Sequence, residues 1–454
     1  MSRVWILPLI MALNACVPVS HGDLPSRTMI AETTLPPMKS FAARAPQVQR
    51  TPNNHLVEDF LELSFEMESG RQLAVLTRFE GPISLRVTGR SAPTLNADLR
   101  GLLARLKAEA GITITPTQDA GANITIDSVS RNAIQRVLPQ AACFVAPNVS
   151  SLSEFRTARR SPKTNWANLR TRERLAIIIP NDASPQEVRD CLHEELAQAL
   201  GPLNDLYRLP NSVFNDDNVH TVLTSFDMLI LRATYAPELS SGMSRDAVAQ
   251  RLPAIFARIN PRGGARGPAR DTYTPQAYVT AIQTALGPGS SYTNRRAAAD
   301  QALRIALANG WTDSRRGFAH YARGRVLQAS NGAAAQQEFQ NADRVYARSN
   351  QTRLHRAFVA TQLGAYALST GDPAKARAIV TPHIARARDA QNAALLATLQ
   401  LLRAETLSSE GRIAEANALR LDSLGWARYG FGADWAVETK VNEISGLADR
   451  SPPV

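Results

Sequence analysis

Long apolar runs are almost absent from this 454-residue sequence. The one near the N-terminus, from Trp5 to Leu13, is too short to span a bilayer as a mature helix. No later stretch approaches spanning length. A protein held in the membrane by transmembrane helices is therefore excluded, and we expect everything beyond Cys16 to lie outside the bilayer.

Cysteine is also scarce, and the first of the three cysteines lies in a segment that resembles an export signal. Arg3 and the apolar run after it are typical of a signal peptide, and the residues Leu13-Asn14-Ala15-Cys16 resemble the lipobox of bacterial lipoproteins. This resemblance implies a signal peptide over residues 1–15 and an acylated Cys16 as the mature N-terminus. The alternative is a plain cleaved signal peptide in which Cys16 is incidental. Val17 does not resemble an inner-membrane retention signal, so we expect a lipid-anchored protein on the periplasmic side of the envelope, at the outer membrane.

The two remaining cysteines, Cys143 and Cys191, predict one disulfide, because the periplasm is an oxidising compartment. In the chain-entropy model, this disulfide would raise the free energy of unfolding by about 4 kcal/mol. Two free buried thiols are the alternative, since sequence alone does not fix their separation.

Composition sets the broad class. Hydrophobic residues make up 44% of the chain and charged residues 20%, as in ordinary globular proteins, and the length favours two or three domains. The formal net charge of +11 favours an anionic partner. Export to the envelope argues against nucleic acid, so we expect none among the partners.

Breaker residues and composition divide the chain into five segments. After the signal peptide, residues 16–55 are rich in Pro, Ser, Thr and Ala and predict a flexible tether. Residues 56–253 have a globular pattern. A linker over residues 254–271 contains the breaker-rich run from Asn260 to Pro268, and residues 272–454 are alanine-rich and predict an all-helical domain.

The helical half contains an internal repeat. Gly332, Gly371 and Gly411 are about 40 residues apart, and each separates two helix-like stretches. Ala376 and Ala416 follow the second and third glycines by five residues, whereas Gln337 takes that place in the first copy. The pattern resembles tetratricopeptide repeats and implies about three helix pairs in an α-solenoid that binds envelope proteins. An irregular helical bundle is the alternative.

The first half reads as mixed α and β structure. We expect strands at Ala74–Thr77, Ile83–Thr88 and Leu175–Ile179, with Leu175–Ile179 central because it is continuously apolar. A further helix is predicted over Asn96–Ala110, and two short alternating strands follow it.

The most informative helix begins at the capping box Ser184-Pro185-Gln186-Glu187 and ends at Gly201. Glu195 falls in the middle of its apolar face. A carboxylate in that position is costly unless it is paired or functional. On helix geometry alone, a buried Glu195 with an Arg or backbone partner is the simpler interpretation.

The residues from Glu194 to Asp205, EELAQALGPLND, resemble the metzincin signature HExxHxxGxxHD. The resemblance implies an α+β zincin fold with Glu195 at the catalytic position and Gly201 at the turn. Phe214 takes the Met-turn position, and the segment from Leu223 to Tyr235 resembles the last metzincin helix. The three zinc-ligand positions are occupied by Glu194, Gln198 and Asn204, and Asp205 follows them.

A closer resemblance is to domain-of-unknown-function family 2927, a group of proteobacterial lipoproteins with the pattern EExxQxxGxxND. The segment Ser212-Val213-Phe214-Asn215-Asp216 also fits this family. The similarity covers roughly Leu56 to Met243 and does not extend to the C-terminal helices.

The departures from the metzincin pattern decide the functional prediction. Zinc at a hydrolytic site requires imidazole or thiolate ligands, whereas Glu194, Gln198 and Asn204 offer one carboxylate and two neutral amides. We therefore expect no zinc, although calcium accepts oxygen ligands of this kind. His193 faces away from Glu195 and does not restore the site.

Three functions follow from this pattern. The first is a non-catalytic, protein-binding scaffold made of a pseudo-metzincin domain and a helical-repeat module. The second is an atypical hydrolase, with an unusual metal or none, that uses Glu195 as general base. The third is a module that binds extended peptides along a sheet edge. A basic run from Arg156 to Arg174 is either a solvated loop or a contact with anionic lipid headgroups.

Overall fold

The computed structural model describes residues 35–42, 46–264 and 267–448. The expected signal peptide and Cys16 lie outside the described residues. Those that are described belong to one compact unit that begins at Leu35.

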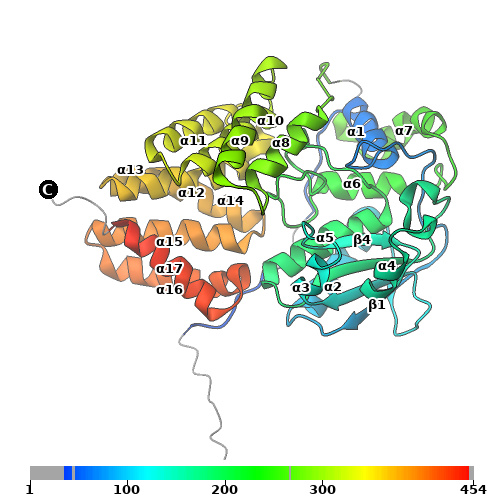
Figure 1. Cartoon of the computed structure of the whole chain (residues 1–454), viewed down its shortest axis with the longest axis horizontal. Coiled ribbons are helices and arrows are strands. Elements are labelled where there is room, and N and C mark those ends of the chain that lie inside the picture. The colour runs from blue at the N-terminus through cyan, green and yellow to red at the C-terminus, as the bar shows by residue number, and fades with distance from the viewer. Residues whose placement is uncertain (1–34, 43–45, 265–266, 449–454) are drawn as a thin grey trace, which may run out of the picture. The chain divides into compact units, whose positions relative to one another are not determined.

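The first half of the described chain contains a five-stranded mixed sheet (Figure 1). In space the strands lie in the order β2-β1-β3-β5-β4, with β4 antiparallel to β5 at one edge and the other pairs parallel. The predicted mixed α and β composition is confirmed at this level. In chain order the strands are β1 (Ile83–Gly89), β2 (Ile114–Pro116), β3 (Ile124–Val129), β4 (Phe144–Pro147) and β5 (Leu175–Pro180).

Strand β5 is central and buried on both faces, as its continuous apolar sequence predicted. Leu175, Ile177 and Ile179 belong to the large core that includes α1, α2, α5 and α6. Ala176 and Ile178 point to the opposite face, where they pack with residues of α3 and α4. The helices of this half are α1 (Asn53–Phe65), α2 (Leu95–Arg105), α3 (Arg131–Gln135), α4 (Leu152–Ala158), α5 (Pro185–Leu200), α6 (Ser225–Thr234) and α7 (Arg245–Ile259), with a π-helical turn at Leu106–Ala110.

One predicted strand is wrong, and one observed strand was not predicted. Residues 74–77 are irregular, because the backbone of Leu76 bonds to the loop at Gly242 and Met243 and not to the sheet. Strand β4 was not foreseen. It is four residues long and ends in proline, which is compatible with its position at the sheet edge.

The second half is helical, as predicted (Figure 1). Its helices are α8 (Gln276–Leu286), α9 (Tyr292–Ala308), α10 (Ser314–Leu327), α11 (Gly332–Tyr346), α12 (Arg353–Ser369), α13 (Pro373–Val380), α14 (Ile384–Asp389), α15 (Ala393–Ser409), α16 (Ile413–Phe431) and α17 (Asp434–Ala448). Short 3-10 turns lie at Pro162–Thr164, Trp166–Asn168, Pro261–Gly263, Asn350–Thr352 and Thr381–His383.

The three expected glycine turns each separate two helices, but the first copy has a different register. Gly371 and Gly411 end their helices with φ of 77° and 75°, in the left-handed region that favours glycine. Gly332 is instead the first residue of α11, after the N-cap Asn331. Counted from the N-caps, the fourth helical residue is a fully or almost fully buried alanine in every copy: Ala335, Ala376 and Ala416. The small residue is therefore present in the first copy, and Gln337 is not its replacement.

Parts of the expected tether and linker contact the folded helices. Phe41 stacks on Trp426 of α16 with ring centroids 4.5 Å apart, and the Lys39 N–H donates to the Gly425 carbonyl at 3.0 Å. In the expected linker, Arg270 pairs with Asp59 of α1 at 2.6 Å. Helix α7 runs through the expected domain boundary at Pro253 and ends at Ile259.

Candidate functional site

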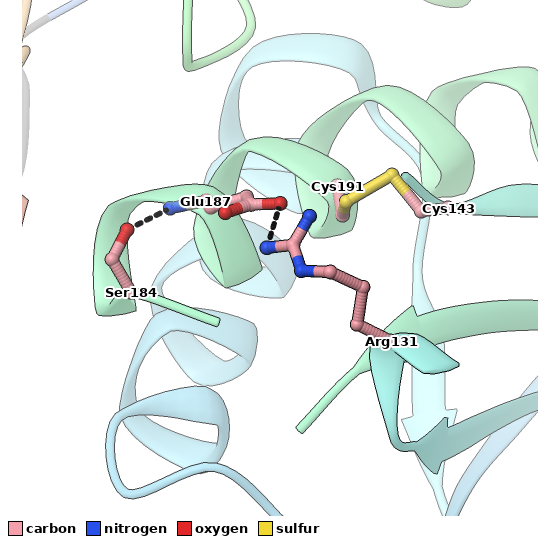
Figure 2. Close-up of a disulfide and its surroundings, with 5 residues drawn as sticks. All are labelled: Arg131, Cys143, Ser184, Glu187 and Cys191. Carbon is pink, nitrogen blue, oxygen red and sulfur yellow. Dashed lines mark hydrogen bonds and ion pairs between the residues drawn. A yellow bond between two sulfur atoms is a disulfide. The ribbon is translucent and has the colours of Figure 1, made fainter. Parts of the chain in front are cut away.

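Helix α5 begins at the predicted cap. Ser184 Oγ accepts a hydrogen bond from the Glu187 N–H at 3.2 Å, and Pro185 is the first helical residue. Figure 2 shows the Glu187 carboxylate directed to Arg131 of α3, at 2.5 Å. An ion pair thus takes the place of the second bond of the capping box and joins the start of α5 to α3.

A disulfide joins α5 to the edge of the sheet. Cys143 directly precedes β4 and Cys191 lies in the second turn of α5, with Cα atoms 5.9 Å apart (Figure 2). The predicted Cys143–Cys191 pair is confirmed. Because Cys191 is one turn before Glu195, the disulfide holds the edge strand beside the motif.

Glu195 lies under that edge strand and is only 5% exposed. Its carboxylate accepts a hydrogen bond from the backbone N–H of Val145 in β4. Its Oε2 atom is buried without a hydrogen-bond partner among the described residues. Burial raises the pKa of Glu195 to about 8, the charges of Glu68 and Asp190 add to the effect, and the Val145 bond opposes it. A carboxyl with this pKa is mostly protonated at neutral pH.

More carboxyls lie around this site: Glu68, Asp190 and Glu194 interact with Glu195 through their charges, and Asp205 interacts with Glu68 and Glu194. Burial raises the pKa of Asp190 to about 7, and the charge of Glu187 contributes. Burial also raises the pKa of Glu194 and of Asp205 well above their ordinary values, and these two groups repel each other. We call Glu68, Asp190, Glu194, Glu195 and Asp205 the acidic cluster.

The end of α5 is fixed by close packing and by a buried arginine. A Cβ atom at Gly201 would lie 3.0 Å from Cγ2 of Thr234 in α6, so a larger residue there would require the Thr234 side chain to shift. Arg172 donates to the carbonyls of Gln198 and Gly201 and lies over the Trp166 ring. A cation at this position stabilises the carbonyl end of the helix.

The turn around Phe214 is organised by a buried aspartate. Asp227 accepts hydrogen bonds from Ser212 Oγ and from the N–H groups of Val213 and Thr224. Burial raises the pKa of Asp227 to about 6, although these bonds favour its charged form. Phe214 is fully buried in the core and presents no polar group to the acidic cluster.

A family model for proteins of unknown function, DUF2927, matches residues 53–254, which include the sheet, α5 and the turn around Phe214. The α/β domain belongs to the DUF2927 family. No relative among curated proteins matches the sequence. The family match ends in α7 and does not extend to the helices from α8 onward.

The motif side chains of the DUF2927 domain are not of the types that zinc takes as ligands at hydrolytic sites. Asn204 uses its side-chain N–H to bond the Glu62 carbonyl in α1 at 3.2 Å. Gln198 supplies a neutral amide, and Glu194 is the one carboxylate of the three. Within the described ranges, no three His, Cys, Asp or Glu side chains are arranged to hold a metal ion. The donor set therefore does not fit zinc, which requires imidazole or thiolate.

His193 and part of the basic run have partners within the DUF2927 domain. His193 is 1% exposed, and its Nδ1 accepts a hydrogen bond from the Leu223 N–H at 3.2 Å, away from the acidic cluster. The basic run is not a uniformly solvated loop. Arg172 is buried, and Arg174 and Lys163 both pair with Glu154.

Asp190 was missed by sequence reasoning, although it lies one helical turn before Glu194 and faces the same side. Val145 was missed because β4 was missed. Their contribution to the site depends on burial and on the disulfide partner, which local spacing does not reveal.

Proposed function

We propose that this protein is a binding scaffold of the bacterial envelope, built from a catalytically degenerate metzincin-like domain and a tetratricopeptide-like module. The sheet supports the metzincin likeness, because its antiparallel edge strand β4 lies beside the long motif helix α5. The recurring buried alanines at the start of α11, α13 and α16 support the repeat likeness.

The non-catalytic assignment rests on one observation: two of the motif side chains, Glu195 and Asn204, bond to backbone groups of the fold itself. Glu195 bonds the Val145 N–H, and Asn204 bonds the Glu62 carbonyl. A general base must be ionised and must reach a water or substrate, and the raised pKa of Glu195 opposes the first requirement.

Exposed apolar side chains on the last two helices support the binding of a protein partner there. Ile413 and Leu421 on α16 are 53% and 60% exposed, and Trp435 on α17 is 72% exposed. Large exposed apolar side chains are common at protein–protein contacts, where aromatic residues contribute most.

The proposed location is the periplasmic side of the envelope, where an acylated Cys16 anchors the protein to the membrane. Within the described part of the chain, no helix combines the length and the apolar character needed to cross a membrane. Fractionation of a Cys16→Ser variant tests the anchor, since the variant should leave the membrane fraction while the wild type stays there. Equal amounts of both in the soluble fraction would exclude a lipid anchor.

Site-specific photo-crosslinking in cells tests the scaffold role. A photoreactive residue at Leu421 or Trp435 should give a discrete adduct with a partner protein, whereas one at the exposed polar position Lys375 should not. The Glu195→Gln variant should give the same adducts, because Glu195 has no catalytic task. Absence of adducts at both apolar positions, or the same adducts at all three, would contradict the proposal.

The runner-up is a hydrolase with Glu195 as general base. It predicts that Glu195→Gln abolishes a peptidase or esterase activity of the purified protein.

The third candidate function is the binding of an extended peptide along β4. The Val145 N–H on that strand already bonds Glu195, so a peptide would have to displace the carboxyl.

A further inference from the structure

A cavity of about 750 Å³ lies between the DUF2927 domain and the helical half. One wall is the loop that includes Tyr207 and Asp216, and the opposite walls come from α8 to α12. This volume is in the range of pockets that bind small molecules and short peptides. It adjoins but does not coincide with the acidic cluster, because Asp216 is among the charges that raise the pKa of Glu194.

The loop side of the cavity is acidic. Asp216 accepts hydrogen bonds from Tyr207 OH at 2.9 Å and from Gln283 Nε2 at 3.3 Å. Both donors are neutral, so no cation compensates its charge within the described residues. The neighbouring Asp217 is bonded to His355 Nε2 at 2.8 Å and is therefore already engaged.

The helical side of the cavity is basic. Arg295 of α9 donates from Nε to the Ala285 carbonyl at 2.8 Å, and Arg325 of α10 donates to Tyr321 OH at 3.2 Å. Neither guanidinium forms an ion pair with a carboxylate in the described ranges, although many other arginines in the helical half do. Each has further N–H donors of the kind that bind carboxylates.

Aromatic side chains line the cavity together with these charges: Phe318, Tyr321, Tyr346 and Phe358. They provide apolar surface on which a side chain or a peptide plane packs. The cavity therefore has a carboxylate on its loop wall and, on its helical wall, aromatic rings and two guanidinium groups that form no ion pair in the described ranges.

We propose that this cavity binds a short peptide with free ends, whose ammonium group lies at Asp216 and whose carboxylate lies at Arg295 and Arg325. The proposal does not depend on the scaffold role, which concerns the surface of α16 and α17. Peptide binding in the cavity and protein binding at those helices are separable properties of the chain.

Equilibrium dialysis of the full-length protein against peptide pools tests this site. The probes are tripeptides randomised at every position, supplied with free ends, with an acetylated N-terminus or with an amidated C-terminus, and the retained peptides are quantified by mass spectrometry. The pool with free ends should be retained about tenfold better than either blocked pool, because each block removes one ionic contact. Equal retention of the three pools, or no retention of any, would overturn the proposal.

Charge-neutralising variants give a crossed pattern that loss of folding does not produce. Asp216→Asn should lose the preference for a free amine and keep that for a free carboxylate. The double variant Arg295→Gln, Arg325→Gln should show the reverse. Arg296→Gln is the matched control, since Arg296 is an exposed neighbour on α9 that does not line the cavity. If the control changes retention as much as the double variant does, the assignment of the carboxylate end is wrong.

Discussion

Replacing Glu195 by glutamine is expected to raise the melting temperature at pH 8 and to leave it nearly unchanged at pH 5. The carboxyl is buried under β4 and its pKa is raised from 4.5 to about 8. Above pH 4.5 the unfolded chain releases this proton while the folded chain keeps it, so the free energy of unfolding falls until the pH passes the folded pKa. Between the unfolded and the folded pKa of such a group, each pH unit lowers the free energy of unfolding by about 1.4 kcal/mol.

Glutamine keeps the oxygen that accepts from Val145 and carries no charge at any pH, so the variant should escape this loss. Asp190 and Asp227, with pKa values raised to about 7 and about 6, change the wild-type stability in the same direction. Thermal or urea unfolding at both pH values is the measurement. Glu173→Gln, at an exposed position, is the control and should show no such gain. A Glu195→Gln variant that is less stable than the wild type at pH 8 would show that the ionised carboxylate is needed there.

Removing the disulfide should lower the free energy of unfolding by about 4 kcal/mol in the chain-entropy model. Cys143 and Cys191 are 48 residues apart, and cross-linking a loop of that length restricts the unfolded chain strongly. The double variant Cys143→Ala, Cys191→Ala avoids placing a hydroxyl at the buried Cys191. Denaturant unfolding of the wild type and the variant measures the difference.

Reduction provides the matched control for this prediction. A reductant should destabilise the wild type by a similar amount and should have no effect on the double variant. A loss below about 1 kcal/mol would mean that β4 and α5 hold together without the covalent link.

Sequence patterns predicted the structure best where a local signal, such as a helix cap or an apolar run, belongs to a buried element. Ser184, Pro185 and Gly201 predicted the start and end of α5, and the apolar run of β5 predicted a central strand; both are confirmed. The disulfide was predictable because only two cysteines remain after Cys16. For α5 and β5 a short-range sequence pattern was sufficient. For the disulfide it was sufficient that no other cysteine remains after Cys16.

Features that depend on tertiary contacts were not predictable in the same way. Strand β4 has four residues, and its position at the edge is set by β5 and the disulfide. Arg172 belonged to a basic run with no sign that it would cap α5 from the interior. The matching positions of the helix pairs are set by the N-caps and not by the glycines, and the N-caps Asn331 and Asp372 each accept a side-chain hydrogen bond from the helix that follows.

The cavity was outside the reach of sequence reasoning for the same reason. Asp216 lies in the loop after α5, whereas Arg295 and Arg325 lie in α9 and α10. Their common pocket exists only because the helical half packs against that loop. Before folding, the two arginines are indistinguishable from other basic residues on alanine-rich helices.

Metal analysis of the purified full-length protein tests the central proposal most directly, which is that the metzincin-like motif of the DUF2927 domain does not bind zinc. The protein should contain no stoichiometric zinc, and incubation with zinc should not raise its melting temperature, because Glu194, Gln198 and Asn204 lack the required ligands. Stoichiometric calcium would identify an oxygen-ligand site and leave the loss of zinc chemistry intact. Stoichiometric zinc that also raises the melting temperature would contradict the account.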